Sequence, residues 1–110
     1  MTTGFTDRQM TPTAITTTNP VNVTIANHGL TNGQYIRASN FVINPAPNAT
    51  GMYQLNYQLF IVGNVSTNTF DLFDQYYNPI DGSDYTPFIS NGLAQFTLTG
   101  PSLNVENNLP

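Results

Sequence analysis

Residues 21–36 read VNVTIANHGLTNGQYI, and this stretch sets the expectation for the fold. In its first half, Val21, Val23 and Ile25 alternate with smaller or polar residues, which is the pattern of a strand with one buried face. Residues 27–33 then combine Asn and Gly in a turn, and Tyr35 begins a second apolar stretch. The sequence here predicts two strands joined by a tight reversal.

Period-two alternation recurs along the rest of the chain, whereas no window of a dozen residues keeps the spacing of an amphipathic helix. A continuous apolar run at 59–62 and β-rich stretches at 14–18, 69–73 and 94–99 predict further strands. We therefore predict an all-β fold, a single small β-barrel or sandwich of about six or seven short strands. Residues 13–99 would form it, between a polar N-terminal arm (1–12) and a polar C-terminal tail (100–110).

The composition is poor in charge. Only 7% of the residues are charged, there is no lysine, and the formal net charge is −4. Arg8 and Arg37 alone cannot form the basic surface that nucleic acids or anionic membranes require, so we expect neither partner. The absence of cysteine excludes disulfides, thiolate metal sites and cysteine nucleophiles. A surface of Thr, Asn, Gln and Ser repels its own copies weakly, which favours a homo-oligomer.

His28 is the single histidine of the chain and the first candidate for chemistry. A catalytic histidine needs an orienting carboxylate and a nucleophile, and no local motif such as G-x-S-x-G accompanies this one. Its place between a strand and Gly29 suits a ring that hydrogen-bonds to backbone groups and holds the loop. We therefore favour a structural role over proton transfer or metal binding.

A group of acidic residues between positions 71 and 84 comprises Asp71, Asp74, Asp81 and Asp84. Calcium prefers carboxylate ligands, so a calcium site is a minor hypothesis, although the spacing matches no calcium loop. A glycosidase-like carboxylate pair beside the neighbouring tyrosines is a further alternative, but it requires a deeper cleft than so small a domain provides. We expect no catalytic residue and no cofactor.

Five pieces of sequence occur in order within residues 14–99: NHGLTNGQYI at 27–36, GMYQLN at 51–56, FIVGNV at 60–65, NTFDLFD at 68–74 and SDYTPFISNG at 83–92. This order resembles the first catalytic-cysteine half-domain (FCCH) of ubiquitin-activating enzymes, a β-barrel module that also occurs in phage tail and head–tail proteins. The matching residues are His28, Gly29, Leu30, Gly33, Met52, Leu55, Asn56, Thr69, Phe70, Tyr85 and Gly92. The chain departs from the pattern at Tyr57, where glycine is usual, and at Asn91, where a second small residue is common.

The resemblance implies a scaffold without an activity, because this module does not carry the reactive cysteine of those enzymes. His28, Gly29, Gly33 and Asn56 would be its structural loop residues. The two glycines can adopt the positive φ angles of a tight reversal, and the asparagine side chain can hydrogen-bond to backbone groups in a turn.

The resemblance further implies a structural protein of a bacteriophage virion. It would pack in a ring at the head–tail junction or in the tail and bind portal, adaptor, tail or capsid subunits. Apolar residues in the terminal segments would then clamp neighbouring subunits, namely Phe5, Met10, Leu103, Val105 and Leu109, unless these segments are ordinary unstructured termini.

Two other functions stay open at this point. The first is a capsid decoration (cement) protein, which shares the small, β-rich and polar character. The second is the carbohydrate-recognition module of a tail fibre, with sugars stacked on Tyr53, Tyr57, Tyr76, Tyr77 or Tyr85. A β-barrel supports many functions, so the fold alone does not rank these alternatives.

Overall fold

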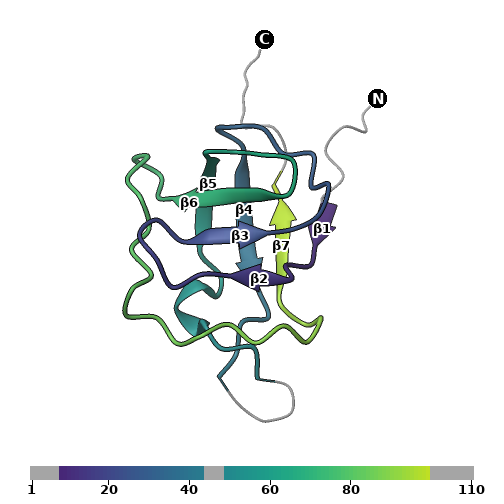
Figure 1. The fold of residues 1–110 in the computed structure, drawn as a ribbon, viewed down its shortest axis with the longest axis vertical. Coiled ribbons are helices and arrows are strands. Elements are labelled where there is room, and N and C mark those ends of the chain that lie inside the picture. Colours follow the sequence, from purple (N-terminus) through teal and green to yellow (C-terminus); the bar gives the residue numbers. More distant parts are fainter. Residues whose placement is uncertain (1–7, 44–48, 100–110) are drawn as a thin grey trace.

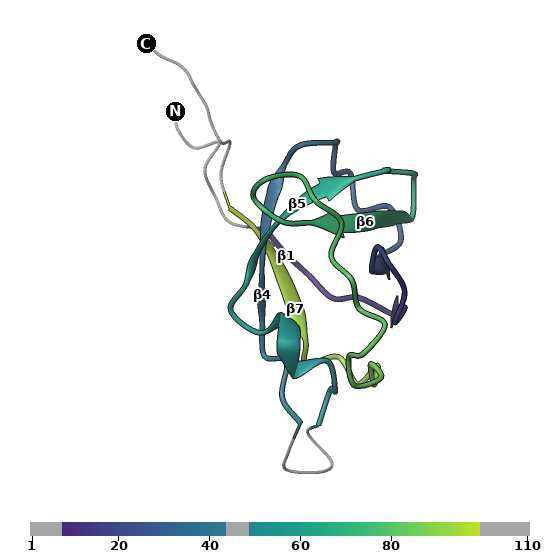
Figure 2. The ribbon, with the colours of Figure 1, turned by 90° about the vertical axis from the view of Figure 1, so that its left-hand side faces the viewer.

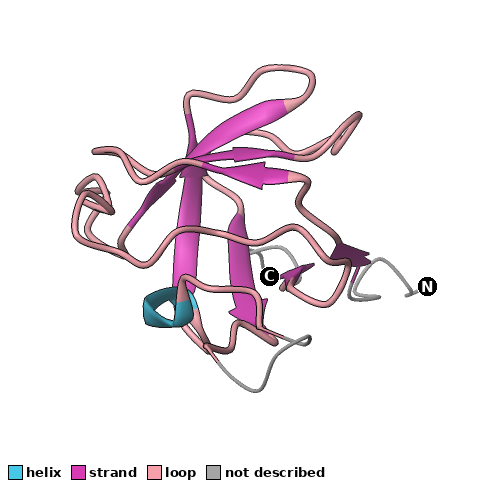
Figure 3. Ribbon diagram, turned by 60° about the horizontal axis from the view of Figure 1, so that its bottom comes forward, coloured by secondary structure: helices cyan, strands magenta, loops and turns pink. Residues whose placement is uncertain are grey.

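The computed structural model describes residues 8–43 and 49–99. In this part the chain forms one sheet of seven antiparallel strands, which confirms the all-β prediction (Figure 1). The strands are β1 (Arg8–Met10), β2 (Ala14–Ile15), β3 (Asn22–Thr24), β4 (Tyr35–Ser39), β5 (Leu59–Gly63), β6 (Thr69–Phe73) and β7 (Gln95–Leu98). In the described residues, one 3₁₀ turn, η2 (Tyr53–Leu55), precedes β5 and is the cyan element of Figure 3.

The sheet curls until its two edges approach each other. Its strand order is β1-β7-β4-β5-β6-β3-β2, so β1 and β2 are the edges although they follow each other in the chain. Residues 11–13 link them, and a linker of this length spans at most roughly 14 Å. Figures 1 and 2 show the result, in which β6, β3 and β2 run across β4 and β7 to enclose a barrel-like interior.

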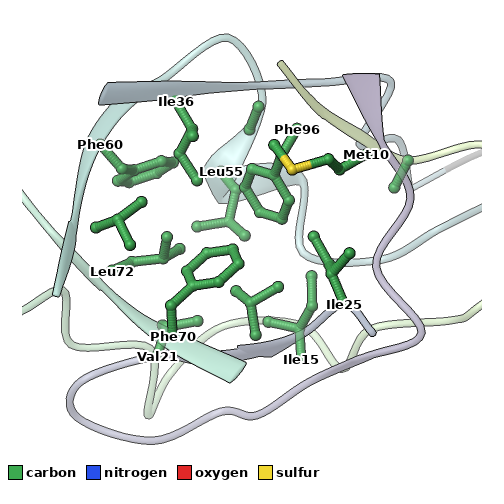
Figure 4. Packing of buried hydrophobic residues seen from close by; sticks show 14 of the residues in the cluster. Met10, Ile15, Val21, Ile25, Ile36, Leu55, Phe60, Phe70, Leu72 and Phe96 are labelled. Carbon is green, nitrogen blue, oxygen red and sulfur yellow. The ribbon is translucent and has the colours of Figure 1, made fainter. Parts of the chain in front are cut away.

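The inward-facing side chains of the strands fill this interior (Figure 4). Phe96 of β7 lies at its centre, with ring centroids 5.5 Å from Phe41 and 6.2 Å from Phe70. Met52 and Leu55, from the segment around η2, are fully buried against the same cluster. Burial of these large apolar groups supplies the main driving force for folding.

The N-terminal boundary of the domain needs a correction. β1 pairs with β7, and Met10 is buried in the core together with Pro12, so residues 8–12 belong to the barrel. The predicted arm over residues 1–12 is therefore wrong for residues 8–12. The sequence does not reveal β1, because this strand has three residues and Met10 is its one buried side chain, which is too short a stretch to show alternation. Phe5, Leu103, Val105 and Leu109 lie outside the described residues.

Candidate interaction surface

His28 holds the turn between β3 and β4. Its ring is 2% exposed and packs edge-on against Phe70, with centroids 5.1 Å apart. The Leu30 N–H donates to Nδ1 at 2.9 Å, and Nε2 lies 3.1 Å from the Thr69 carbonyl oxygen. A neutral ring protonated on Nε2 satisfies both partners, so the imidazole fastens the turn to β6 and has no nitrogen left for a ligand.

The other predicted loop residues also serve the backbone. Gly29 and Gly33 have φ angles of 70° and 93°, as a tight reversal requires. The Asn56 side-chain oxygen accepts a hydrogen bond from the Phe41 N–H at 3.1 Å. Tyr57 has a φ of 62°, so the position at which the resemblance expects glycine adopts the conformation that favours glycine.

The four aspartates do not gather at a common site. Asp71 accepts hydrogen bonds from the amides of Asn22 and Asn64, each at 2.8 Å, while Asp74 and Asp81 bind the backbone of their own turns. Within residues 8–43 and 49–99, no group of three or more His, Cys, Asp or Glu side chains could hold a metal ion. The calcium hypothesis therefore has no ligand cluster in this part of the chain.

Hydrogen bonds within their turns lower the pKa of two of these carboxylates, those of Asp74 and Asp81. The hydrogen bond from the Asn78 backbone N–H lowers the pKa of Asp74, and that from the Tyr76 backbone adds to it. The Ser83 side chain, followed by its backbone N–H, lowers the pKa of Asp81. Hydrogen bonds to the ionised form explain both shifts, so these acids act as turn supports.

The tyrosines considered for sugar stacking differ in exposure. Tyr76 and Tyr57 are 86% and 71% exposed, and Tyr53 and Tyr77 are about half exposed. Tyr85 packs against the core instead, and burial raises the pKa of its hydroxyl. These rings stand on different segments of the chain, and Tyr77 already stacks on Phe73.

The outside of β5 and β6 is covered by the chain itself. Ile61 and Phe73 are cross-strand neighbours, both are buried, and neither belongs to the cluster that fills the barrel. The loop after β6 turns back so that the Tyr77 ring stacks on Phe73, with centroids 4.6 Å apart and planes 17° from parallel. We call Ile61, Gly63, Phe73 and Tyr77 the covered face.

The outside of β1, β7 and β4 carries no such cover in the described residues. Gln9, Thr97 and Arg37 stand side by side on these three strands, and Leu59 of β5 continues the row. A shallow hollow on this side is lined by Gln9, Arg37, Ser39, Tyr57, Thr97 and Thr99. We call these six residues the Arg37 face.

The Arg37 face offers several hydrogen-bonding groups to the solvent. The Arg37 guanidinium donates through Nη1 to the Tyr57 carbonyl oxygen at 3.1 Å, and this bond fixes the side chain over the hollow. A guanidinium has five N–H donors, so donors remain for a ligand. With the hydroxyls of Ser39, Thr97 and Thr99, the face can bind a carboxylate or a strongly hydrogen-bonding group.

The sequence patterns did not single out this face, because none of its residues forms a motif. The one available signal was alternation: Arg37 and Thr97 occupy the outward positions between Ile36 and Ala38 and between Phe96 and Leu98. That places them on a surface without showing that the two strands are neighbours. The sheet order supplies this information.

Comparison with known proteins adds no family to these observations. No protein-family model matches the chain, and no curated protein matches it. In the part of the chain that the structure describes, no helix is long and apolar enough to cross a membrane.

Proposed function

We propose that this protein is a structural component of a bacteriophage virion that occupies a fixed position at the head–tail junction or in the tail. It binds neighbouring subunits there and packs in a ring. The virion assignment rests on the resemblance to the FCCH-like module. The observation that supports a binding part is the Arg37 face, a broad outer surface that the described chain leaves uncovered.

The position of the chain ends supports the same proposal. β1 begins at Arg8 directly opposite Leu98 of β7, so the described residues nearest the two chain ends, Arg8 and Thr99, lie on or next to adjacent strands beside the Arg37 face. Peptide segments attached at one side of a rigid domain are suited to binding neighbouring subunits. A capsid decoration protein would use the same features at a higher copy number.

The copy number in the particle tests this function. Quantitative mass spectrometry of purified virions gives the amount of this chain relative to the major capsid subunit. A small ring of copies is the expected result. A number comparable to the capsid subunit would replace the proposal with capsid decoration, and absence from the particle would overturn a virion role.

Carbohydrate recognition is a second candidate, favoured by the high exposure of Tyr57 and Tyr76. Exposed aromatic rings next to hydroxyl and amide groups are the usual surface for sugar binding. A glycan array probed with the full chain tests it. Binding to defined glycans that is lost in Tyr57→Ala or Tyr76→Ala would support this candidate, and an array without binding would remove it.

A further inference from the structure

We propose that the Arg37 face binds the C-terminal segment of a second copy of this chain, residues 101–110, through an ion pair between Arg37 and Glu106. This inference rests on the proposed role in assembly and identifies one of the contacts that the assembly uses. It follows from three properties: the charge of the face, the sequence of the segment, and the point where the segment leaves the barrel.

The first property is that positive charge is scarce and Arg37 is available. Arg8 and Arg37 are the only basic side chains of the sequence apart from its single histidine. Arg8 donates from Nη2 to the Met10 sulfur at 3.1 Å, along its own strand. Arg37 is exposed, its orientation is fixed by the Tyr57 carbonyl, and its planar fork matches a carboxylate in bidentate geometry.

The second property is the pattern of the segment PSLNVENNLP. Within residues 102–109, the even positions Ser102, Asn104, Glu106 and Asn108 are all polar, whereas Leu103, Val105 and Leu109 occupy odd positions. In an extended strand the even side chains share one face. Glu106, the only glutamate of the chain, would therefore approach the Arg37 face in the company of amides and a hydroxyl that match Ser39, Thr97 and Thr99.

The third property is the direction in which the chain leaves the barrel. Thr99 lines the hollow, and Arg37 is the partner of Thr97, two residues back along β7. The chain would have to reverse at once to return to its own Arg37. Extended, residues 99–106 reach about 23 Å, which equals the shortest extent of the molecule, 23 Å, so the segment can cross to a neighbouring copy.

An exchange of charges tests this contact in the full-length chain. Arg37→Glu and Glu106→Arg are made singly and together, and the dissociation constant of the homo-oligomer is measured by sedimentation at low ionic strength. Each single reversal should weaken association about tenfold or more, because it places like charges together. The double reversal should restore association to near the wild-type value.

Arg8→Gln is the matched control, because it removes the only other basic residue apart from His28 and should leave association unchanged. Unchanged association of the single reversals, or no restoration in the double variant, would overturn the Arg37–Glu106 contact while leaving the role in assembly intact. A wild-type chain that stays monomeric would overturn exchange between copies. If the wild type stayed monomeric, and the melting temperature fell in each single reversal and recovered in the double variant, the segment would bind the Arg37 face of its own chain instead.

Discussion

The covered face and the Arg37 face are two outer surfaces of one sheet that differ in how they meet the solvent. On β5 and β6 the outward side chains of Ile61 and Phe73 are apolar, and the loop after β6 lays Tyr77 over Phe73 to shield them. On β1, β7 and β4 the outward side chains are polar, so this surface is stable in water without a cover. The comparison shows that the chain shields one face by itself and, in the described residues, leaves the other face uncovered.

Truncation of Phe73 should give the largest effect. Phe73→Ala removes a buried ring from between Ile61, Gly63 and Tyr77, and we expect a loss of about 3 kcal/mol in the free energy of unfolding. Thr97→Ala, at an outward position of the Arg37 face, should change it by less than about 0.5 kcal/mol. Equilibrium urea denaturation measures both. Equal effects would show that the two faces do not differ in their contribution to stability.

A methyl group at Gly63 should have the next largest effect. A β-carbon there would collide with the Phe73 ring and would lie 2.9 Å from the Tyr77 hydroxyl. Gly63→Ala should therefore destabilise the protein by about 2 kcal/mol through overpacking. The same substitution in a Phe73→Leu background should cost clearly less, since the collision is relieved. An identical cost in both backgrounds would exclude packing against Phe73 as the cause.

A comparison of Tyr77 with Tyr57 measures how much the Tyr77 ring contributes to the free energy of unfolding. Tyr57 and Tyr77 both adopt left-handed backbone angles, with φ of 62° and 64°, but only Tyr77 stacks on another ring in the described residues. Tyr77→Ala should cost about 1 kcal/mol for the lost stacking and burial, and Tyr57→Ala should cost less than about 0.5 kcal/mol. Urea denaturation of the two variants side by side measures the difference, and a larger cost at Tyr57 would contradict it.

The same two faces show which features of the structure could be predicted from the sequence and which could not. Alternation identified the inward residues of β3, β6 and β7, and the Asn and Gly residues of 27–33 identified the turn that His28 holds. Alternation does not report which strands are neighbours, so the row Gln9, Thr97 and Arg37 was not predictable from pattern. The cover of Phe73 was also hidden, because residues 75–92 have the composition of an ordinary polar loop.

The turn after β6, which positions Tyr77, is expected to lose stability at low pH. Asp74 accepts hydrogen bonds from the backbone N–H groups of Tyr76 and Asn78, at 2.8 and 2.9 Å, and so determines where Tyr77 is placed. These bonds, that from Asn78 most of all, lower the pKa of Asp74 below its ordinary value of 3.8. A carboxyl whose pKa is lower in the folded state binds fewer protons there than in the unfolded chain. Its contribution to stability is therefore complete above 3.8 and is lost as the pH falls through the lower, folded-state pKa.

Asp74→Asn isolates this contribution, because the amide oxygen keeps an acceptor in place while the charge is removed. The variant should melt below the wild type at about pH 7, and the difference should shrink as the pH falls below about 4. Melting temperatures of both proteins across this range measure it. Asp81→Asn is the control: the pKa of Asp81 is also lowered, so the pH dependence should have the same sign, but its turn contacts Ser83 and not the cover. Amide exchange at Tyr77 should therefore increase in Asp74→Asn alone, and an equal increase in both variants would show that Asp74 does not hold the cover in place.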